Sequence, residues 1–238
     1  MTIELVTFDL DNTLWESHQV LLRATKETNS WIVEHVPEHA SLSDERLKEL
    51  SDTVRRERPE IAHDVSAFRV AYMERCFREV GLTATDARRY AQDAFAVFIH
   101  WRCQVDPYPD AIRLLAELSK VYQLASITNG NANVSQTSID RYFSFNVNAE
   151  NAGAAKPSVR IFHLALKLGG VKEPSRAVHV GDSLREDIEG AANAGMKTVW
   201  LDHEREPTDN VATAVVHELT DVRQAIQSID VRSRSAYS

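Results

Sequence analysis

From Pro107 onward the sequence alternates between short apolar runs typical of β-strands and amphipathic runs typical of helices. Strands are expected at residues 123–128, 145–148, 177–180, 197–201 and 212–216, and helices at 112–118, 133–142, 159–168, 185–194 and 221–229. Gly195 is expected to close the fourth of these helices. A further apolar run at residues 3–8 predicts one more strand near the start of the chain. Alternation at this spacing predicts a parallel sheet with helices on both faces.

Between the first strand and the rest, residues 14–105 show long helical periodicity and almost no strand signal. Three apolar stripes carry that periodicity: Val20, Leu21, Ala24, Trp31 and Ile32; Val65, Phe68, Tyr72, Cys76 and Val80; and Tyr90, Ala94, Phe98 and Trp101. We therefore predict an α/β fold: a Rossmann-like doubly wound parallel sheet core with an inserted all-helical domain. The core is expected at residues 1–14 and 106–230, the insert at 15–105, and a flexible tail at 231–238.

The composition limits the class of protein. With 43% hydrophobic and 26% charged residues, the 238-residue chain is typical of folded globular proteins and can bury a substantial core. The two cysteines, Cys76 and Cys103, lack the spacing of a disulfide framework, a zinc ribbon or a haem site. A net charge of −8 argues against nucleic-acid binding. No signal peptide and no membrane-spanning run is expected, so the chain is predicted to be cytoplasmic. It is expected to be a monomer or a homodimer.

Polar and acidic residues follow several predicted strands. Asp9 and Asp11 come after the first strand, Thr128-Asn129-Gly130 after the second, and Gly181-Asp182-Ser183 after the strand at 177–180. Asp187 lies five residues beyond Asp182, and Lys156 precedes Pro157 in a loop. Ligands of open α/β sheets bind at the carboxyl ends of the strands, so we expect these side chains to share one crevice.

Carboxylates that converge in this way need a compensating charge. Two like charges about 4 Å apart repel by about 4 kcal/mol at an effective dielectric constant of about 20. Either some of these groups are protonated or a cation lies among them. A hard ion such as Mg²⁺ suits oxygen ligands, and the lack of histidine at these strand ends argues against zinc or iron.

The same residues form four ordered motifs: Asp9-x-Asp11-x-Thr13, Thr128-Asn129, Lys156-Pro157, and Gly181-Asp182 followed by Asp187. Together they resemble the motifs of the haloacid dehalogenase superfamily, in its phosphatase branch, and the resemblance covers nearly the whole chain. Each motif is weak alone, but all four in order are specific. The resemblance implies a Mg²⁺-dependent phosphatase acting on a small phosphorylated metabolite. The helical insert would be its C1-type cap, which closes over the crevice and selects the substrate.

The resemblance assigns the chemistry to Asp9 and Asp11. Asp9 would attack phosphorus and form an aspartyl-phosphate. Asp11 would protonate the leaving oxygen and then deprotonate the water that hydrolyses the intermediate. The side chains of Asp9 and Asp182 and the backbone carbonyl of Asp11 would hold Mg²⁺.

The remaining motif residues would bind the phosphate and position the catalytic groups. By the same resemblance, Thr128 and the backbone N–H of Asn129 bind phosphate oxygens, and Lys156 neutralises both the nucleophile and the phosphoryl group. Asp187 would orient Lys156 or a metal-bound water, and Thr13 would support the first motif.

Asp11 separates two reactions within the superfamily. The dehalogenases have no second aspartate in the first motif, because a halide leaving group needs no proton. Asp11 therefore favours a phosphate ester as substrate, and Asp182 agrees because dehalogenases do without this metal ligand.

Residues 58–65 (RPEIAHDV), 101–102 (WR) and 127–132 (ITNGNA) resemble one bacterial subgroup. It contains the phosphatases that act on 5-amino-6-(5-phospho-D-ribitylamino)uracil in riboflavin biosynthesis and on FMN, which become the leading substrates. A sugar phosphate or phosphoglycolate is the alternative. A dehalogenase, a phosphomutase and a non-catalytic phosphometabolite-binding protein are weaker hypotheses.

Each candidate also has a purely structural interpretation. Asp9 and Asp11 can form a turn after a strand, and Asp187 can be a first-turn helix carboxylate. In the insert, the aromatic side chains are expected mainly in the core, and the histidines are expected to be structural. Two roles are possible for Arg58, Arg69 and Arg102: each can form an ion pair at the surface or contact the substrate.

Overall fold

The computed structural model describes residues 2–205 and 211–235. The chain divides into two compact units, one of residues 1–16, 106–130 and 137–238 and one of residues 17–105 and 131–136. The insert was predicted at residues 15–105, and the first segment of the helical unit spans residues 17–105. The prediction nevertheless placed residues 131–136 in the sheet domain, whereas the structure groups them with the helices. Among the described residues, no helix has both the length and the apolar character needed to cross a bilayer.

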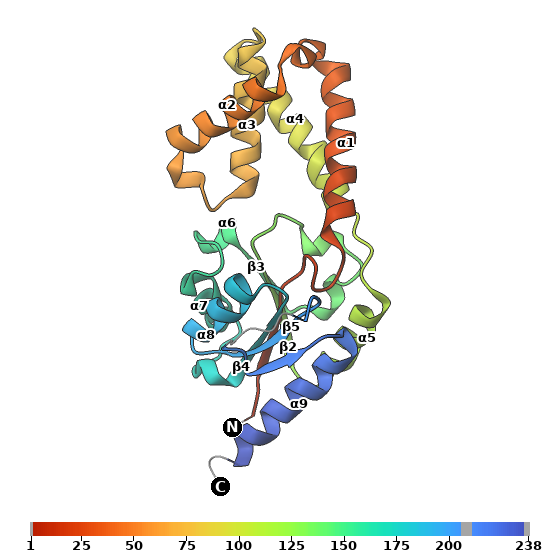
Figure 1. The fold of residues 1–238 in the computed structure, drawn as a ribbon, viewed down its shortest axis with the longest axis vertical. Coiled ribbons are helices and arrows are strands. Elements are labelled where there is room, and N and C mark those ends of the chain that lie inside the picture. Colours follow the sequence, from red (N-terminus) through yellow and green to blue (C-terminus); the bar gives the residue numbers. More distant parts are fainter. Residues whose placement is uncertain (1, 206–210, 236–238) are drawn as a thin grey trace. The chain divides into compact units, whose positions relative to one another are not determined.

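The first unit is built on a six-stranded parallel sheet with the order β3-β2-β1-β4-β5-β6 (Figure 1). Its strands are β1 (Leu5–Phe8), β2 (Gln123–Thr128), β3 (Phe145–Asn148), β4 (Ala177–Gly181), β5 (Lys197–Leu201) and β6 (Ala214–Val216). Leu5 of β1 is in register with Gln123 of β2 and with Ala177 of β4. The strand order turns back at β1, so the carboxyl ends of β1, β2 and β4 meet at a switch point where ligands of such sheets bind. The predicted fold class is confirmed.

Helices cover both faces of this sheet (Figure 1). One face packs α6 (Ala149–Ala152), α7 (Val159–Leu168) and α8 (Gly190–Asn193), and the other packs α5 (Pro109–Leu118) and α9 (Leu219–Ser235). A short helical turn, η5 (Pro174–Arg176), precedes β4. Beneath α7 the core includes Leu5, Ile127, Val147, Ile161 and Phe162, all fully buried. Burial of each such side chain stabilises the fold by about 1.5–3 kcal/mol.

The predicted helix at 133–142 is wrong. The structure has only two short turns there, η3 (Val134–Gln136) and η4 (Asp140–Tyr142). The Asn133 side chain accepts hydrogen bonds from both the backbone and the hydroxyl of Ser135, at 3.1 and 2.6 Å. Short polar side chains that bind nearby backbone in this way compete with helix formation.

Two further helices differ in form or length from the prediction. The segment predicted as a helix at 185–194 begins with a π-helical turn, η6 (Leu184–Glu189), and continues as α8; Gly195 follows it with a φ of +82°. The predicted flexible tail from residue 231 is helical as far as Ser235, because α9 continues through it. Residues 236–238 lie outside the described part of the chain.

The second unit is helical, as predicted. Its elements are α1 (Ser17–His35), η1 (Pro37–Ser41), α2 (Asp44–Glu57), η2 (Pro59–Ile61), α3 (Val65–Glu79) and α4 (Ala84–Arg102). Ser43, Asp64 and Thr83 cap α2, α3 and α4 by accepting backbone N–H groups, which are otherwise unpaired at a helix start. The core of this unit contains Ile32, Val36, Met73, Phe77, Ala87, Ala91 and Ala94.

Candidate active site

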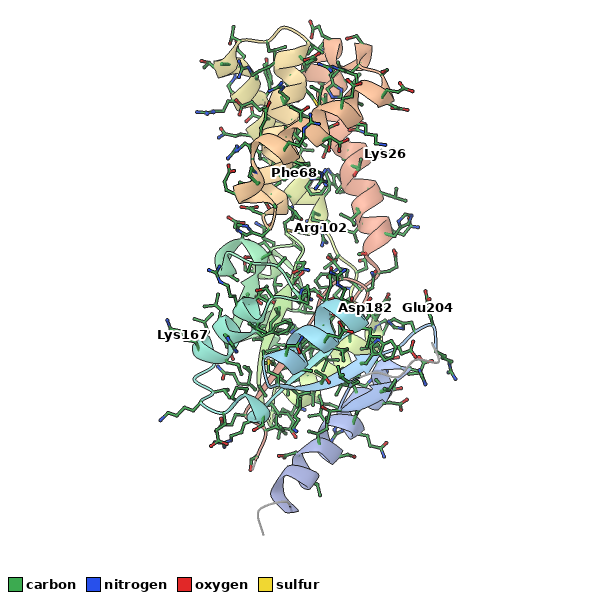
Figure 2. All side chains as sticks on the ribbon, turned by 60° about the vertical axis from the view of Figure 1, so that its left-hand side comes forward. Lys26, Phe68, Arg102, Lys167, Asp182 and Glu204 are labelled. Carbon is green, nitrogen blue, oxygen red and sulfur yellow. The ribbon has the colours of Figure 1, made fainter. Side chains whose placement is uncertain are left out.

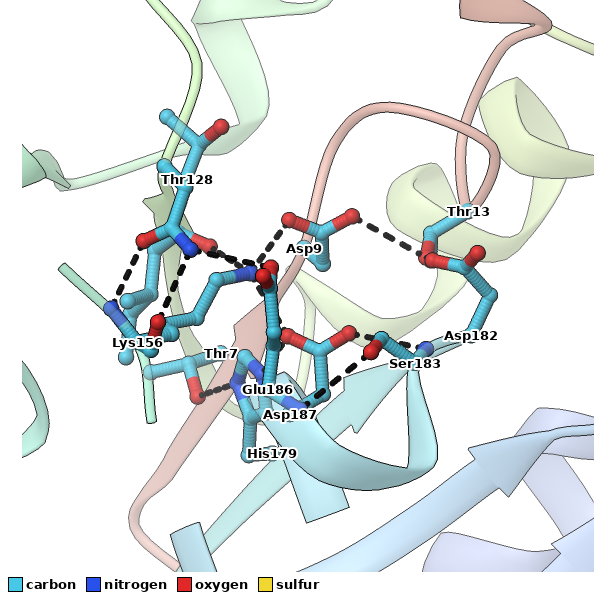
Figure 3. Close-up of polar contacts among 12 residues, drawn as sticks. Thr7, Asp9, Thr13, Thr128, Lys156, His179, Asp182, Ser183, Glu186 and Asp187 are labelled. Carbon is cyan, nitrogen blue, oxygen red and sulfur yellow. Dashed lines mark hydrogen bonds and ion pairs between the residues drawn. The ribbon is translucent and has the colours of Figure 1, made fainter. Parts of the chain in front are cut away.

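Asp9 lies at the carboxyl end of the central strand. It directly follows β1, and its backbone N–H continues the sheet by donating to the carbonyl of Val180 at 2.8 Å. The residue is only 6% exposed. The sheet therefore fixes the backbone of Asp9 and leaves its carboxylate in a largely dry position (Figure 3).

Lys156 joins two carboxylates of the site. Its Nζ donates to Oδ1 of Asp9 at 2.5 Å, to Oδ1 of Asp187 at 2.6 Å and to the carbonyl of Ile127 at 3.0 Å (Figure 3). All three donors of the ammonium group are thus used, and the side chain is almost completely buried. A lysine held in this way is a fixed positive charge beside Asp9.

Asn129 holds the backbone of Lys156. Its Oδ1 accepts the Lys156 N–H at 2.7 Å, and its Nδ2 donates to the Lys156 carbonyl at 3.0 Å and to Oε2 of Glu186 at 2.9 Å. This side-chain contact was not foreseen, because only the Asn129 backbone was assigned a role. Thr128, beside it at the end of β2, is buried, and its Oγ1 accepts the N–H of Gly130 at 2.9 Å.

Asp182 and Asp187 come from the segment after β4 (Figure 3). Oδ1 of Asp182 accepts from the Thr13 hydroxyl at 3.1 Å, and the same hydroxyl lies 3.4 Å from Oδ2 of Asp9. Oδ2 of Asp187 accepts the N–H of Ser183 at 3.1 Å. Thr13 thereby links the carboxylates that follow β1 and β4.

Gly181 permits the close approach of Asp187. A Cβ atom at position 181 would lie 2.3 Å from Cγ of Asp187, a distance at which the carboxylate would have to move. The glycine of this motif is therefore a steric requirement of the site and not only a turn residue.

Asp11 is held by Trp15. The indole Nε1–H donates to Oδ1 of Asp11 at 2.8 Å, and the ring itself is completely buried. The aromatic side chains of residues 15–105 were expected mainly in the core, and Trp15 lies there, but its hydrogen bond to Asp11 was not foreseen. The spacing of four residues in the loop is the only signal in the sequence that could have indicated it.

Two further polar residues, Thr7 and His179, were also missed. They are partners in register on β1 and β4, and the His179 ring lies between Oγ1 of Thr7 at 2.8 Å and Oδ1 of Asp187 at 3.1 Å (Figure 3). Both residues are 0% exposed. A polar residue within an otherwise apolar strand was the available sequence signal for each.

The carboxylates of Asp9, Asp182 and Asp187 differ in how their surroundings shift their pKa values. Burial raises the pKa of Asp9 well above its usual range; the charges of Asp187 and Asp182 add to the rise, and Lys156 opposes it. Burial also raises the pKa of Asp182. Although burial alone would raise the pKa of Asp187, the Lys156 charge and the His179 hydrogen bond outweigh it and lower that pKa to about 2. The Asp187–Lys156 pair is therefore ionic, whereas Asp9 and Asp182 lack sufficient positive charge.

This donor set fits a hard divalent cation. Asp9, Asp182 and Asp187 each offer a carboxylate oxygen, and these atoms lie within 4.8 Å of one another. Lys156 is the ammonium group that pairs with two of them. Because Asp187 already accepts from Lys156, His179 and Ser183, the carboxylates of Asp9 and Asp182 are the better metal ligands.

The candidates in the helical unit have mainly structural surroundings. Arg58 pairs with Glu60 at 3.0 Å on the surface, the Arg69 guanidinium lies 3.7 Å from the centroid of the Phe98 ring, and Arg102 is 1% exposed. The aromatic candidates contact other rings: Trp31 stacks on His35, Phe68 lies parallel to Tyr72, and Trp101 meets His100 edge to face. Figure 2 labels Phe68 and Arg102 on this unit.

Comparison with known proteins adds independent evidence. A sequence profile of haloacid dehalogenase-like hydrolases matches residues 3–195. The chain is 34% identical to the 5-amino-6-(5-phospho-D-ribitylamino)uracil phosphatase YigB of Escherichia coli, over 84% of this chain and 83% of that protein. It is 31% identical to a glyceraldehyde 3-phosphate phosphatase of Methanopyrus kandleri, over 84% of each. The crystal structure of a 2-haloacid dehalogenase from Pseudomonas syringae pv. Tomato superposes with a TM-score of 0.90 at 34% identity, covering 95% of this chain and 99% of that one.

Proposed function

This chain belongs to the haloacid dehalogenase-like hydrolase family and is a phosphatase, and we propose that it hydrolyses a small phosphorylated metabolite through an aspartyl-phosphate on Asp9. The observation that carries the proposal is the buried carboxylate of Asp9 at a strand end, bound to Lys156 at 2.5 Å. A nucleophile needs an oriented, poorly hydrated carboxylate, and an anionic ester needs positive charge beside it.

In the first step, Oδ2 of Asp9 attacks phosphorus. Lys156 donates to Oδ1 at 2.5 Å, whereas Oδ2 has the Thr13 hydroxyl at the longer distance of 3.4 Å, so Oδ2 is the more available oxygen for the new bond. As the Asp9 oxygen–phosphorus bond forms, the bond between phosphorus and the ester oxygen breaks. That oxygen takes a proton from the Asp11 carboxyl group, which the Trp15 indole orients.

In the second step, Asp11 returns to its acid form. It accepts a proton from a water molecule whose oxygen attacks phosphorus, and the phosphorus–Asp9 bond breaks. The products are inorganic phosphate and the free Asp9 carboxylate. Thr128 and the backbone N–H of Asn129 hold the phosphate oxygens, and Lys156 opposes their charge through both steps.

We propose Mg²⁺ as the cofactor, held by the side chains of Asp9 and Asp182 and the backbone carbonyl of Asp11. When bound, it supplies positive charge that reduces the repulsion between the nucleophile and the phosphate. Burial raises the pKa of both side-chain ligands, which is the electrostatic condition that a cation would relieve.

The proposed substrate is 5-amino-6-(5-phospho-D-ribitylamino)uracil or FMN. Support comes from the identity to the Escherichia coli phosphatase of that name over most of both chains. A sugar phosphate is the alternative, supported by the similarity to the Methanopyrus enzyme. The proposed substrate-selecting cap is the helical unit, so specificity should depend on it. Comparison of kcat/KM for these esters, phosphoglycolate and phosphoserine decides the question; a best value for a sugar phosphate would reject the riboflavin-pathway assignment.

The similarity to the Pseudomonas dehalogenase makes haloacid hydrolysis the second candidate. The presence of Asp11, held by Trp15, argues against it because a departing halide needs no proton. The two reactions differ in an observable way. Halide release from 2-chloropropionate that persists in EDTA and in Asp11→Asn would overturn the phosphatase proposal.

Hydrolysis of p-nitrophenyl phosphate tests the phosphatase chemistry. We expect activity with Mg²⁺, reversible loss in EDTA, and a fall of at least about 10⁴-fold in Asp9→Asn. Asp221→Asn is the matched control, since Asp221 is an exposed carboxylate in the first turn of α9. Full activity in Asp9→Asn would reject Asp9 as the nucleophile.

A further inference from the structure

His179 has polar contacts at both ring nitrogens although it is fully buried. It lies on β4 with its Nδ1 2.8 Å from Oγ1 of Thr7 and its Nε2 3.1 Å from Oδ1 of Asp187. The Phe162 ring of α7 packs edge-on against the imidazole, with centroids 5.2 Å apart and an angle of 80°. Thr7, Phe162 and Asp187 therefore hold the ring in place from three sides.

The contacts of the ring define its tautomer. Asp187 is an acceptor, because its carboxylate is paired with Lys156 at 2.6 Å, so the proton of the His179–Asp187 bond belongs to Nε2. Burial keeps the imidazole neutral by lowering its pKa. Nδ1 is then an acceptor, and the Thr7 hydroxyl donates to it at 2.8 Å in preference to the Val178 carbonyl at 3.3 Å.

The chain of contacts continues to the proposed nucleophile. Oδ1 of Asp187 accepts hydrogen bonds from both His179 and Lys156. The Lys156 ammonium group also donates to Oδ1 of Asp9 at 2.5 Å. The other carboxylate oxygen, Oδ2, has the Ser183 N–H at 3.1 Å. Without the imidazole, Oδ1 of Asp187 would lose one of its two donors and keep the Lys156 ammonium group, so the position of the carboxylate, and of the ammonium group that pairs with it, would be less firmly fixed.

We propose that His179 is a positioning residue for the phosphatase reaction: Thr7 holds it in the Nε2–H tautomer, and it fixes Asp187 so that Lys156 meets Asp9. This inference rests on the proposed function. Neither residue touches the reacting atoms, so both act through the Asp187–Lys156 pair. Loss of the hydrogen-bond partners that orient a metal ligand typically costs about 10–100-fold in activity, and we expect an effect of the same order for a group that orients Asp187.

His179→Gln and His179→Asn form the matched pair that tests the proposal. A glutamine amide nitrogen can reach about the position of Nε2 and still donate to Asp187, whereas an asparagine amide reaches only about the position of Nδ1. With p-nitrophenyl phosphate and saturating Mg²⁺, we expect kcat of His179→Gln within about threefold of wild type. We expect kcat of His179→Asn to fall about 10–100-fold, with KM nearly unchanged. Equal losses in both variants, or no loss in either, would overturn the proposal.

A second pair covers the case in which the His179 variants do not fold. Thr7→Ser keeps the hydroxyl, and Thr7→Val is nearly isosteric but removes it. We expect kcat to fall about tenfold in Thr7→Val and to be retained in Thr7→Ser. Wild-type kcat in Thr7→Val would overturn the proposal, as would a loss in both variants that follows their melting temperatures.

The tautomer itself gives a readout that does not depend on activity. Long-range ¹H–¹⁵N NMR spectra distinguish a protonated from an unprotonated imidazole nitrogen. We expect Nδ1 of His179 to be unprotonated in the wild type and in Thr7→Ser; a protonated Nδ1 would overturn the assignment. An inactive wild type would reject the proposed function, whereas an active wild type with unaffected variants would reject this inference alone.

Discussion

Asp9→Asn should stabilise the metal-free protein while it abolishes activity. The substitution replaces a buried carboxylate with a neutral group of almost the same shape. Its carbonyl oxygen can still accept from Lys156, and its amide can donate to Oγ1 of Thr13, which itself donates to Asp182. The hydrogen bonds are thus kept, and mainly the charge is removed.

The magnitude follows from the distances in the site. Carboxylate oxygens within 4.8 Å of one another repel by at least about 3.5 kcal/mol per pair at an effective dielectric constant of about 20, and Asp9 has two such neighbours. The attraction to Lys156 at 2.5 Å offsets about this sum on the same scale. What remains is the cost of burying the charge, which is several kcal/mol for an ion in a protein interior. This balance agrees with the raised pKa of Asp9. Allowing for the weaker hydrogen bond from Lys156, we expect a gain of about 2 kcal/mol in the free energy of unfolding.

Urea unfolding of EDTA-treated protein at neutral pH measures this gain, with Asp221→Asn as the control. A gain of about 2 kcal/mol corresponds to a rise of about 4–8 °C in the melting temperature for a chain of this size. Mg²⁺ should reduce the difference in the free energy of unfolding between Asp9→Asn and the wild type, because it binds and stabilises the native wild type more than the variant. If metal-free Asp9→Asn is less stable than the wild type, burial does not destabilise the Asp9 carboxylate and the electrostatic argument fails.

Two further predictions concern Asp187. The pKa of Asp187 is lowered from the usual value to about 2. The ionised carboxylate should therefore contribute about 2 kcal/mol to the free energy of unfolding above about pH 4, and this contribution should be lost as the pH falls toward about 2. In urea unfolding, the difference in the free energy of unfolding between the wild type and Asp187→Asn should therefore become smaller over that pH range. A difference that stays constant with pH would contradict this prediction. Gly181→Ala should lower kcat by at least about 100-fold, because its Cβ would displace the Asp187 carboxylate and with it Lys156. Wild-type kcat in this variant, measured with p-nitrophenyl phosphate, would show that the displacement does not matter.

Much of the architecture was predictable because it depends on local patterns. The strands and helices of the sheet unit follow from hydrophobic periods that are read within a few residues. The helix predicted at 133–142 failed where Asn133 binds Ser135 locally, a competition that periodicity does not detect. The prediction of a flexible tail from residue 231 is wrong as far as Ser235, because α9 continues to that residue.

The gathering of Asp9, Asp182 and Lys156 was also predictable, since parallel strands place their carboxyl ends at one edge. The catalytic roles of these residues stay predictions until the variants are measured. The sequence could not show that Asn129 binds both backbone groups of Lys156, because that contact depends on how two loops meet.

The residue types and their order along the chain were sufficient to predict the sheet, the acidic site and the family. Only the tertiary structure decided which polar groups support that site. Thr7 and His179 lie far apart in the sequence and meet because β1 and β4 pair in one particular register. A shift of one residue in the pairing of β1 with β4 would place the two side chains on opposite faces of the sheet. Contacts between strands therefore depend on register, which the local pattern of either strand alone does not specify.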